Sequence, residues 1–332
     1  MRGFGLLLAF LALCGIAQAE TVQPEMAHPV GLTMLTVKDP ASGGPVRSLI
    51  WYPSQSAGEP TRMGPFVLDA SRDMPAAKGH FPLILLSHGN EGSYLSHRDS
   101  AMALAQAGYI VATPMHAGDN FQDRRLLGTE VLLSSRPKSI SALIDALLAD
   151  GRLPIDPKKI GFIGFSAGGY TGLALLGARP SYARAALHCE DHPQDPICQY
   201  APVDPGKPVL ITDLSDNRIK AAVLMDPLTW NFNDDELAAV KTPVYLMRPE
   251  QGDVLAEAFH SDRIAKVSPG VETVWSIKHA GHFSFLAPFP EAIKADVGPI
   301  AQDAPGFDRK AVHEEINHRM IDFFGRVLTP RS

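Results

Sequence analysis

Several features are missing from this chain of 332 residues, and each absence excludes a class of protein. Basic residues form neither a block nor a stripe with aromatics, and the formal net charge is -6, so we expect no nucleic-acid partner. Beyond the first twenty residues no apolar run is long enough to cross a bilayer, so we expect no stable membrane anchor. Internal repeats, low-complexity tracts and dividing linkers are also missing, which favours a single domain.

Cysteine is rare as well, with three in the chain, and the first lies in a segment unlike the rest. Residues 1–19 contain Arg2, an apolar stretch at 6–13 and a small-residue site before Glu20. This order is typical of a secretory signal peptide and its cleavage site. We therefore expect an exported protein, periplasmic or secreted, whose mature chain is one domain of residues 20–332.

The two remaining cysteines, Cys189 and Cys198, lie nine positions apart. In an oxidising compartment such a pair most simply forms a disulfide that closes a loop. His188 and His192 crowd the same stretch, so a zinc site is the competing hypothesis. The spacing matches no zinc-knuckle pattern, which favours the disulfide, and we expect no metal.

The most informative motif is Gly164-Phe165-Ser166-Ala167-Gly168, a G-x-S-x-G turn between an apolar run and a helix-forming stretch. Such a turn lifts the serine hydroxyl clear of a sheet, and its glycines permit a crowded backbone. A nucleotide-binding turn is the alternative, but the spacing is not G-x-G-x-x-G and the motif lacks the Lys-Ser/Thr of a phosphate loop. The pattern therefore favours hydrolysis with Ser166 as the nucleophile.

Strand-like and helix-like segments alternate along the chain. Continuous apolar strands are expected where both sheet faces are covered, and this alternation favours a mostly parallel, doubly wound sheet with helices on both faces. Proline-rich insertions at about 180–218 and 286–308 break the alternation, and we expect them to form walls of a substrate pocket. We expect strands at 32–37, 47–52, 81–87, 109–113, 159–165, 219–225, 243–247 and 271–277, and helices at 98–106, 140–148, 170–176 and 315–327.

A serine hydroxyl needs a base within hydrogen-bond reach, and this architecture orders serine, acid and histidine along the chain. His282 follows the last expected strand in a glycine-containing loop, from which an imidazole can reach the serine, whereas the alternative, His279, lies nearer the strand. The acid is either Asp226, which ends the strand at 219–225, or Asp253, which follows the next strand. We favour Asp226 and keep both candidates.

The negative charge that develops on the substrate oxygen requires two backbone N–H donors. We expect one from Ala167, directly after the serine, and the other from Asn90, in the glycine-rich turn after the strand at 81–87. His88 in that turn is expected to be a structural hydrogen-bonding residue rather than a catalyst.

Together these residues resemble the α/β-hydrolase superfamily, in particular the bacterial predicted dienelactone hydrolases and the related platelet-activating-factor acetylhydrolases. Dienelactone hydrolase proper has a cysteine nucleophile where this chain has Ser166. The acetylhydrolases place their acid where Asp226 stands, and other members place theirs where Asp253 stands. The resemblance covers nearly the whole mature chain, and its motifs are the His88-Gly89 turn, the G-x-S-x-G elbow and Ala280-Gly281-His282-Phe283-Ser284-Phe285.

The resemblance implies an α/β-hydrolase fold and a serine esterase that cleaves carboxylic esters through an acyl-enzyme, without a cofactor. We expect the substrate to be a small-molecule or lipid-like ester. A catalytically silent hydrolase fold that only binds a ligand is the alternative, and a generic esterase assay separates the two. Nothing in the residues indicates an oligomeric state.

Overall fold

The computed structural model describes residues 27–200 and 211–330, so the signal peptide expected at 1–19 lies outside the described residues. Within them, nine strands form one sheet in the order β11-β10-β9-β8-β6-β7-β2-β1-β5. Strands β11 to β7 pair in parallel, while β2 and then β1 are added antiparallel. The strands are β1 (Val30–Lys38), β2 (Pro45–Pro53), β5 (Ser71–Arg72), β6 (Phe81–Ser87), β7 (Ile110–Met115), β8 (Ile155–Phe165), β9 (Ile219–Met225), β10 (Val244–Pro249) and β11 (Val271–Ile277).

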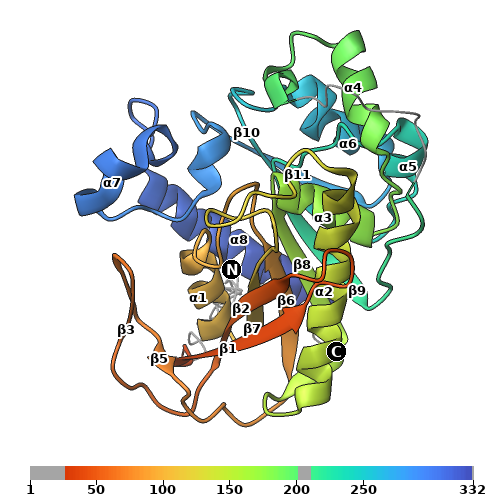
Figure 1. The fold of residues 1–332 in the computed structure, drawn as a ribbon. Helices are drawn as coiled ribbons and strands as arrows, with labels where there is room; N and C mark the ends of the chain where they lie inside the picture. The colour runs from red at the N-terminus through yellow and green to blue at the C-terminus, as the bar shows by residue number, and fades with distance from the viewer. Residues whose placement is uncertain (1–26, 201–210, 331–332) are drawn as a thin grey trace, which may run out of the picture.

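Helices cover both faces of the sheet, as the alternation of segments predicts (Figure 1). Two of them, α1 and α8, pack on one face, and α2, α3 and α6 pack on the other. The parallel order and the two covered faces confirm the doubly wound sheet. The helices are α1 (Arg98–Gln106), α2 (Glu130–Asp150), α3 (Ala167–Leu175), α4 (Tyr182–Asp191), α5 (Asp234–Ala238), α6 (Ser261–Val267), α7 (Glu291–Val297) and α8 (Arg309–Leu328).

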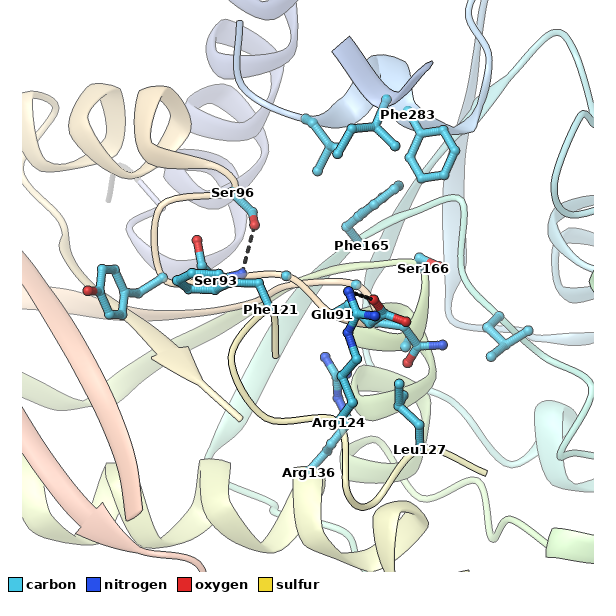
Figure 2. Close-up of a pocket in the computed structure, with 18 of the residues that line it drawn as sticks. Glu91, Ser93, Ser96, Phe121, Arg124, Leu127, Arg136, Phe165, Ser166 and Phe283 are labelled. Atoms are coloured by element: carbon cyan, nitrogen blue, oxygen red, sulfur yellow. Dashed lines mark hydrogen bonds and ion pairs between the residues drawn. The ribbon is translucent and has the colours of Figure 1, made fainter. Parts of the chain in front are cut away.

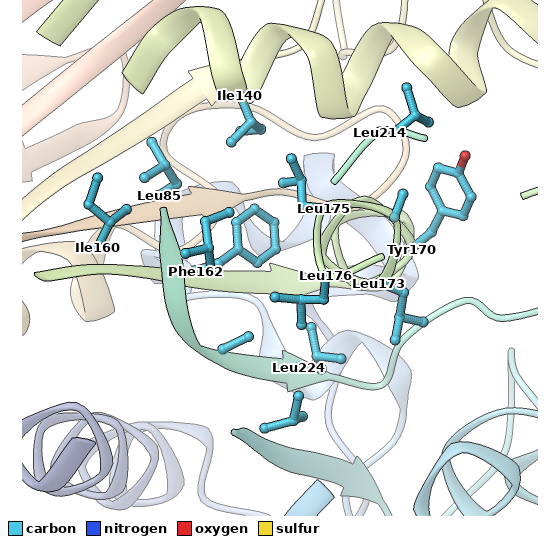
Figure 3. Close-up of a cluster of buried hydrophobic side chains, with 14 of the residues drawn as sticks. Leu85, Ile140, Ile160, Phe162, Tyr170, Leu173, Leu175, Leu176, Leu214 and Leu224 are labelled. Carbon is cyan, nitrogen blue, oxygen red and sulfur yellow. The ribbon is translucent and has the colours of Figure 1, made fainter. Parts of the chain in front are cut away.

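The apolar strands supply two separate cores because successive side chains of a strand point to opposite faces. On β6, Leu83 and Leu85 join the core under α2 and α3, while Ile84 and Leu86 join the core under α1 and α8. Figure 3 shows Leu85 and Phe162 in the first of these cores. Full burial of such side chains contributes about 1.5–3 kcal/mol each, so the central strands are anchored from both sides.

Helix α2 begins ten residues before the predicted 140–148 segment and runs through Pro137. A proline inside a helix removes one N–H and leaves the carbonyl four residues earlier without its partner. Here that carbonyl belongs to Leu133, and the Tyr170 hydroxyl donates a hydrogen bond to it at 2.9 Å. A tertiary hydrogen bond thus replaces the missing helical one, so α2 continues through Pro137. The sequence alone does not reveal this contact.

The described parts of the two insertions, which for the first exclude residues 201–210, contain short helices on opposite sides of α3 in Figure 1. The first contains α4 and the 3-10 turn η1 (Pro196–Tyr200), which the disulfide Cys189–Cys198 joins. The second contains α7 and the 3-10 turn η4 (Gly298–Ala301). A hairpin of β3 (Thr61–Met63) and β4 (Phe66–Leu68) forms a further arm beside the sheet. Among the described residues, a search for helices with the length and hydropathy of a membrane span finds none.

Candidate active site

The turn at Ser166 is strained in the manner of a nucleophile elbow. Ser166 has φ 55 and ψ -116, a region that residues other than glycine rarely adopt. A Cβ added to Gly164 would collide with the Gly168 carbonyl, and one added to Gly168 would collide with the Ser87 carbonyl. Both glycines of the motif are therefore needed for close backbone approach, which places the serine hydroxyl at the start of α3.

Backbone hydrogen bonds tie this turn to the end of the neighbouring strand β9. Ser166 N–H donates to the Met225 carbonyl at 3.0 Å, and Leu228 N–H donates to the Ser166 carbonyl at 3.1 Å. Between these two bonds lies Asp226, which has φ 42 and whose own N–H donates to the Met247 carbonyl of β10 at 2.8 Å. Such strained residues persist only where surrounding contacts fix them, and they cluster at functional sites.

Three side chains form a hydrogen-bonded chain over this turn. His282 Nδ1 lies 2.5 Å from Asp226 Oδ2, and His282 Nε2 lies 3.0 Å from Ser166 Oγ. A carboxylate only accepts hydrogen bonds, so the ring proton is on Nδ1 and Nε2 accepts the Ser166 hydroxyl. His282 is 3% exposed and Asp226 is 1% exposed. The arrangement can support attack by Ser166 with His282 as base and Asp226 as the orienting acid.

The other two candidates from the sequence lie differently. Asp253 Oδ1 accepts a hydrogen bond from the His282 backbone N–H at 2.8 Å, so this carboxylate holds the loop rather than the imidazole. The His279 side chain is 67% exposed and lies 3.7 Å from Glu250. Asp226 and Asp253 thus both contact His282, the first through the imidazole ring and the second through the backbone N–H.

Two buried histidines hold the 3-10 turn η3 (His282–Phe285) in place. His97 Nδ1 donates to the Phe285 carbonyl at 3.0 Å, and His313 Nε2 donates to the Ser284 carbonyl at 2.9 Å. Burial lowers the pKa of His97 to about 4, so this ring is neutral at pH 7. Neither histidine stood out in the sequence, because each supports a turn that is distant along the chain.

His88 orients the turn from which Asn90 is expected to serve as an oxyanion donor. The His116 N–H donates to His88 Nε2 at 3.2 Å, so the His88 ring proton is on Nδ1, which donates to the Gly89 carbonyl at 2.6 Å. Burial, and then the charge of Arg136, lowers the pKa of His88 well below its usual range. Because a trans peptide is planar, fixing the Gly89 carbonyl also fixes the opposite direction of the Asn90 N–H.

Arg136 of α2 holds the same turn from below and was missed in the sequence (Figure 2). Its guanidinium donates to the His88 carbonyl and pairs with Asp119, and both side chains of this ion pair are almost fully buried. The other oxygen of Asp119 accepts from the Glu91 N–H at 2.8 Å. Glu91 has φ 57, so a third strained residue lies in the site. The arginine and the aspartate together clamp both ends of the 88–91 turn.

Neither the Asn90 N–H nor the Ala167 N–H donates to another group in the part of the chain that the structure describes. A Cβ added to Gly89 would lie 3.3 Å from Ser166 Cβ, so the turn packs directly against the nucleophile. Two backbone donors without partners beside a serine can hydrogen-bond a substrate oxygen as it becomes negative.

Ser166 opens into a cavity of about 1200 Å³, with Phe165 and Phe283 on one side (Figure 2). This volume exceeds the 300–1,000 Å³ that is common for small-molecule sites. Arg124 at its rim is paired with Glu91 at 2.6 Å. Both insertions contribute to the walls, together with the β3–β4 hairpin. The apolar lining includes Met63, Phe66, Phe121, Leu127, Leu132, Tyr182, Ile197, Tyr200, Trp230, Phe289, Val297 and Ile300.

A second cluster, His188, Asp195 and His260, places three possible metal-ligand atoms within 4.8 Å of one another. The Thr229 N–H donates to His260 Nδ1 at 3.1 Å, so the ring proton is on Nε2, which donates to Asp195 Oδ2 at 2.9 Å. A metal at Nε2 would require the proton on Nδ1, where the Thr229 N–H already points.

Burial raises the pKa of Asp195, but hydrogen bonds from His188 and His260 outweigh it and hold this pKa low. Because Cys189 and Cys198 are bonded to each other, they offer no thiolate ligands for the competing zinc hypothesis. We therefore interpret the cluster of His188, Asp195 and His260 as a hydrogen-bonded bridge that joins α4 and η1 to the segment before α6.

Among the solved structures that match the fold are two hydrolases of different types. A ferulic acid esterase from Streptomyces cinnamoneus shares 17% identity with a TM-score of 0.63, over 92% of this chain and 91% of that chain. A puromycin-hydrolysing peptidase of Mycobacterium tuberculosis shares 14% identity with a TM-score of 0.54; the match covers 90% of this chain but 40% of the peptidase. No protein-family model and no curated protein matches the sequence. The chain therefore has the α/β-hydrolase fold, as its motifs suggested.

The contacts of Asp226 and Asp253 predict unequal effects of two matched substitutions. Asp226→Asn should lower kcat for a chromogenic ester by roughly 10⁴-fold, because an amide at this position favours the wrong imidazole tautomer. Asp253→Asn keeps an oxygen that can accept from the His282 N–H, so we expect a loss within about tenfold, from small misplacement alone. Steady-state kinetics on both variants, with circular dichroism to verify folding, measure the difference. A larger loss in folded Asp253→Asn would transfer the role to the later acid.

The clamp on the 88–91 turn predicts an effect of Arg136→Lys. Lysine keeps the charge beside Asp119 but lacks the planar fork that also reaches the His88 carbonyl. We expect kcat to fall by roughly 10- to 100-fold, less than the 10²–10³-fold that loss of an oxyanion donor costs, while KM changes little. The exposed Arg152, which pairs with Asp150, provides the control Arg152→Lys. Equal kinetics for the two variants would show that the clamp does not orient the turn.

Proposed function

We propose that this protein is a serine hydrolase that cleaves carboxylic esters through an acyl-enzyme. The observation that carries the proposal is the hydrogen-bonded chain from Ser166 Oγ through the His282 ring to Asp226, on a strained turn that opens into a large cavity. The backbone N–H groups of Asn90 and Ala167 lie beside this chain, and its last member is a buried carboxylate. Attack on a carbonyl requires both features.

In the proposed reaction, Ser166 Oγ attacks the ester carbonyl carbon and its proton moves to His282 Nε2. Asp226 stabilises the imidazolium that forms, and the N–H groups of Asn90 and Ala167 bind the oxyanion. The C–O bond to the alcohol then breaks, and His282 returns the proton to the leaving oxygen. Water, activated by His282, next attacks the acyl-serine, which releases the carboxylic acid and restores the Ser166 hydroxyl.

The size and lining of the cavity support an ester with a sizeable apolar group. Aromatic and aliphatic side chains from several separate segments enclose the space next to Ser166. Such a site fits a small-molecule or lipid-like ester, in keeping with the resemblance to dienelactone hydrolases and platelet-activating-factor acetylhydrolases. The esterase among the structural neighbours supports ester cleavage, whereas the peptidase makes an amide substrate the second candidate.

We also propose that the chain is exported as a single domain of residues 20–332. Cleavage before Glu20 would remove Cys14 and leave two cysteines, which the structure pairs with each other. The intact mass of protein purified from the exported fraction should equal that of residues 20–332 less two hydrogens. A mass that includes residues 1–19 would refute processing, and two added hydrogens would refute the disulfide in the mature protein.

Ser166→Ala should abolish hydrolysis of chromogenic esters, with a loss of at least roughly 10³-fold, because only binding and the oxyanion donors remain. A fluorophosphonate probe should label the unmodified protein at Ser166 and leave the variant unlabelled. Ser56→Ala, at an exposed serine, is the matched control and should behave as the parent.

The same assay separates the competing functions. Ester substrates of increasing acyl length, each beside its matched amide, should show turnover of the esters and a preference for longer or bulkier groups. Faster turnover of the amides would favour a peptidase. Substrate binding without turnover or probe labelling, in the folded parent protein, would favour the catalytically silent alternative.

A further inference from the structure

Glu257 is a buried acid that the proposed reaction leaves without a role. It begins the 3-10 turn η2 (Glu257–Phe259), which follows β10, and its side chain is 11% exposed. Both of its carboxyl oxygens are buried without a hydrogen-bond partner in the described part of the chain. A buried carboxylate without donors is costly, so such a group either binds a proton or meets a cation.

The nearest cation does not neutralise this acid. Arg248 Nη1 lies 3.6 Å from Glu257 Oε2, beyond hydrogen-bond distance, and the same guanidinium lies 3.5 Å from Asp262. Burial, and then the negative charge of Asp226, raises the pKa of Glu257 to about 8, against the smaller opposing effect of Arg248. Glu257 is therefore a neutral carboxylic acid at pH 7.

One carboxylate oxygen of Asp226, Oδ1, has only a weak hydrogen-bond donor among the described residues. Its Oδ2 is bound to the His282 ring, but the donor to its Oδ1 is the Ser261 hydroxyl at the long distance of 3.4 Å. The Ser261 side chain also adjoins Glu257. Ser261 thus stands between the two carboxyl groups, one of which needs a donor and the other of which carries a proton.

We propose that Glu257 is a positioning residue for Asp226, acting through Ser261 as a neutral acid, and that its ionisation at alkaline pH displaces Asp226 and slows hydrolysis. In the proposed arrangement the Glu257 carboxyl, whose oxygens have no partner among the described residues, turns its O–H toward Ser261 Oγ. The Ser261 O–H donates to Asp226 Oδ1, so one proton is held between the two carboxyl groups and none is transferred. The proposal rests on the proposed function, because Asp226 must be the acid that orients His282.

The charged surroundings determine the direction of the pH effect. Asp226 after β9, Arg248 on β10 and Asp262 on α6 face Glu257, and His282 lies beyond Asp226. His260 is neutral and bound to Asp195, because burial lowers its pKa. Loss of the Glu257 proton therefore adds a second negative charge beside Asp226 with no new cation to balance it.

The same ionisation affects stability. Below about pH 4.5 Glu257 is neutral in the folded and unfolded states, and the pKa shift has no effect. As the pH rises above this value the unfolded chain loses the proton first, so the folded state becomes less stable until about pH 8, where the penalty is complete. Replacement of Glu257 by a neutral residue should remove this destabilisation.

The test compares Glu257→Gln with the parent protein in ester hydrolysis from about pH 6 to 9.5. We expect the parent kcat/KM to fall above about pH 8, by up to roughly tenfold per pH unit. The Glu257→Gln profile should lack this alkaline decline, with activity at pH 7 within about threefold of the parent. Glu250→Gln, at an acid that also follows β10 but is half-exposed, is the matched control and should keep the parent profile. In parallel, the Tm of the parent should fall more between pH 6 and 9 than the Tm of Glu257→Gln.

Each outcome decides a separate claim. If the parent and Glu257→Gln show the same alkaline decline in hydrolysis, Glu257 does not have the proposed role. The role is also overturned if Glu257→Gln loses kcat by the same factor at every pH, because that result indicates a merely structural contact. Equal Tm shifts in the two proteins would overturn the buried ionisation itself. If the parent hydrolyses no ester but the two proteins differ in Tm shift as expected, the proposed function is refuted, and the positioning role is refuted with it. The ionisation of Glu257 would then still be supported.

Discussion

The pair of backbone hydrogen bonds between Ser166 and the end of β9 is the constraint on which the candidate site depends. These bonds join the turn after β8 to the turn after β9, so they fix Ser166 and Asp226 relative to each other although the two residues are distant in sequence. Each residue carries a positive φ that costs of order 1–3 kcal/mol. The carboxyl ends of β8 and β9, which are buried on both faces, keep the two residues in these conformations. The candidate site accordingly lies at the carboxyl edge of these strands.

Several buried histidines differ from His282 in how their ring nitrogens are used. His88, His260 and His313 each use both ring nitrogens on protein groups, so they have no nitrogen left to take a proton from a substrate or a serine. The His282 ring differs, because its second nitrogen meets a serine hydroxyl at the wall of a cavity. Because both of their ring nitrogens are bound to protein groups, we interpret His88, His260 and His313 as structural residues.

The sequence predicts the sheet well and the surroundings of the site poorly, for physical reasons. Short continuous apolar segments fit a strand covered on both faces, so the ranges expected for β6 and β9 match the observed strands. The range expected for β11 also matches, although this strand lies at the edge of the sheet and is largely exposed. The short helices α4 to α7 were missed because proline and polar residues hide a weak helical period. The roles of Arg136 and Glu257 could not be predicted, because each depends on a residue that is not adjacent in sequence. Arg136 pairs with Asp119, and Glu257 lies near Asp226. The proposed roles of Ser166, His282 and the two oxyanion donors remain predictions.

Three of the acids that follow β9 and β10 lie near the candidate site, and they differ in their surroundings rather than in their order along the chain. Asp226 is buried and bonded to an imidazole, Asp253 is exposed and bonded to a backbone N–H, and Glu257 is buried without a donor. A charge at Asp253 is solvated and acts weakly on the ring, whereas a charge at Asp226 acts at short range in a medium of low dielectric constant. A second buried charge would have to share the same few donors, which is why the proposal gives Glu257 the neutral form. Local solvation therefore favours Asp226 as the candidate acid, and the strand order only brings the candidates close to the imidazole.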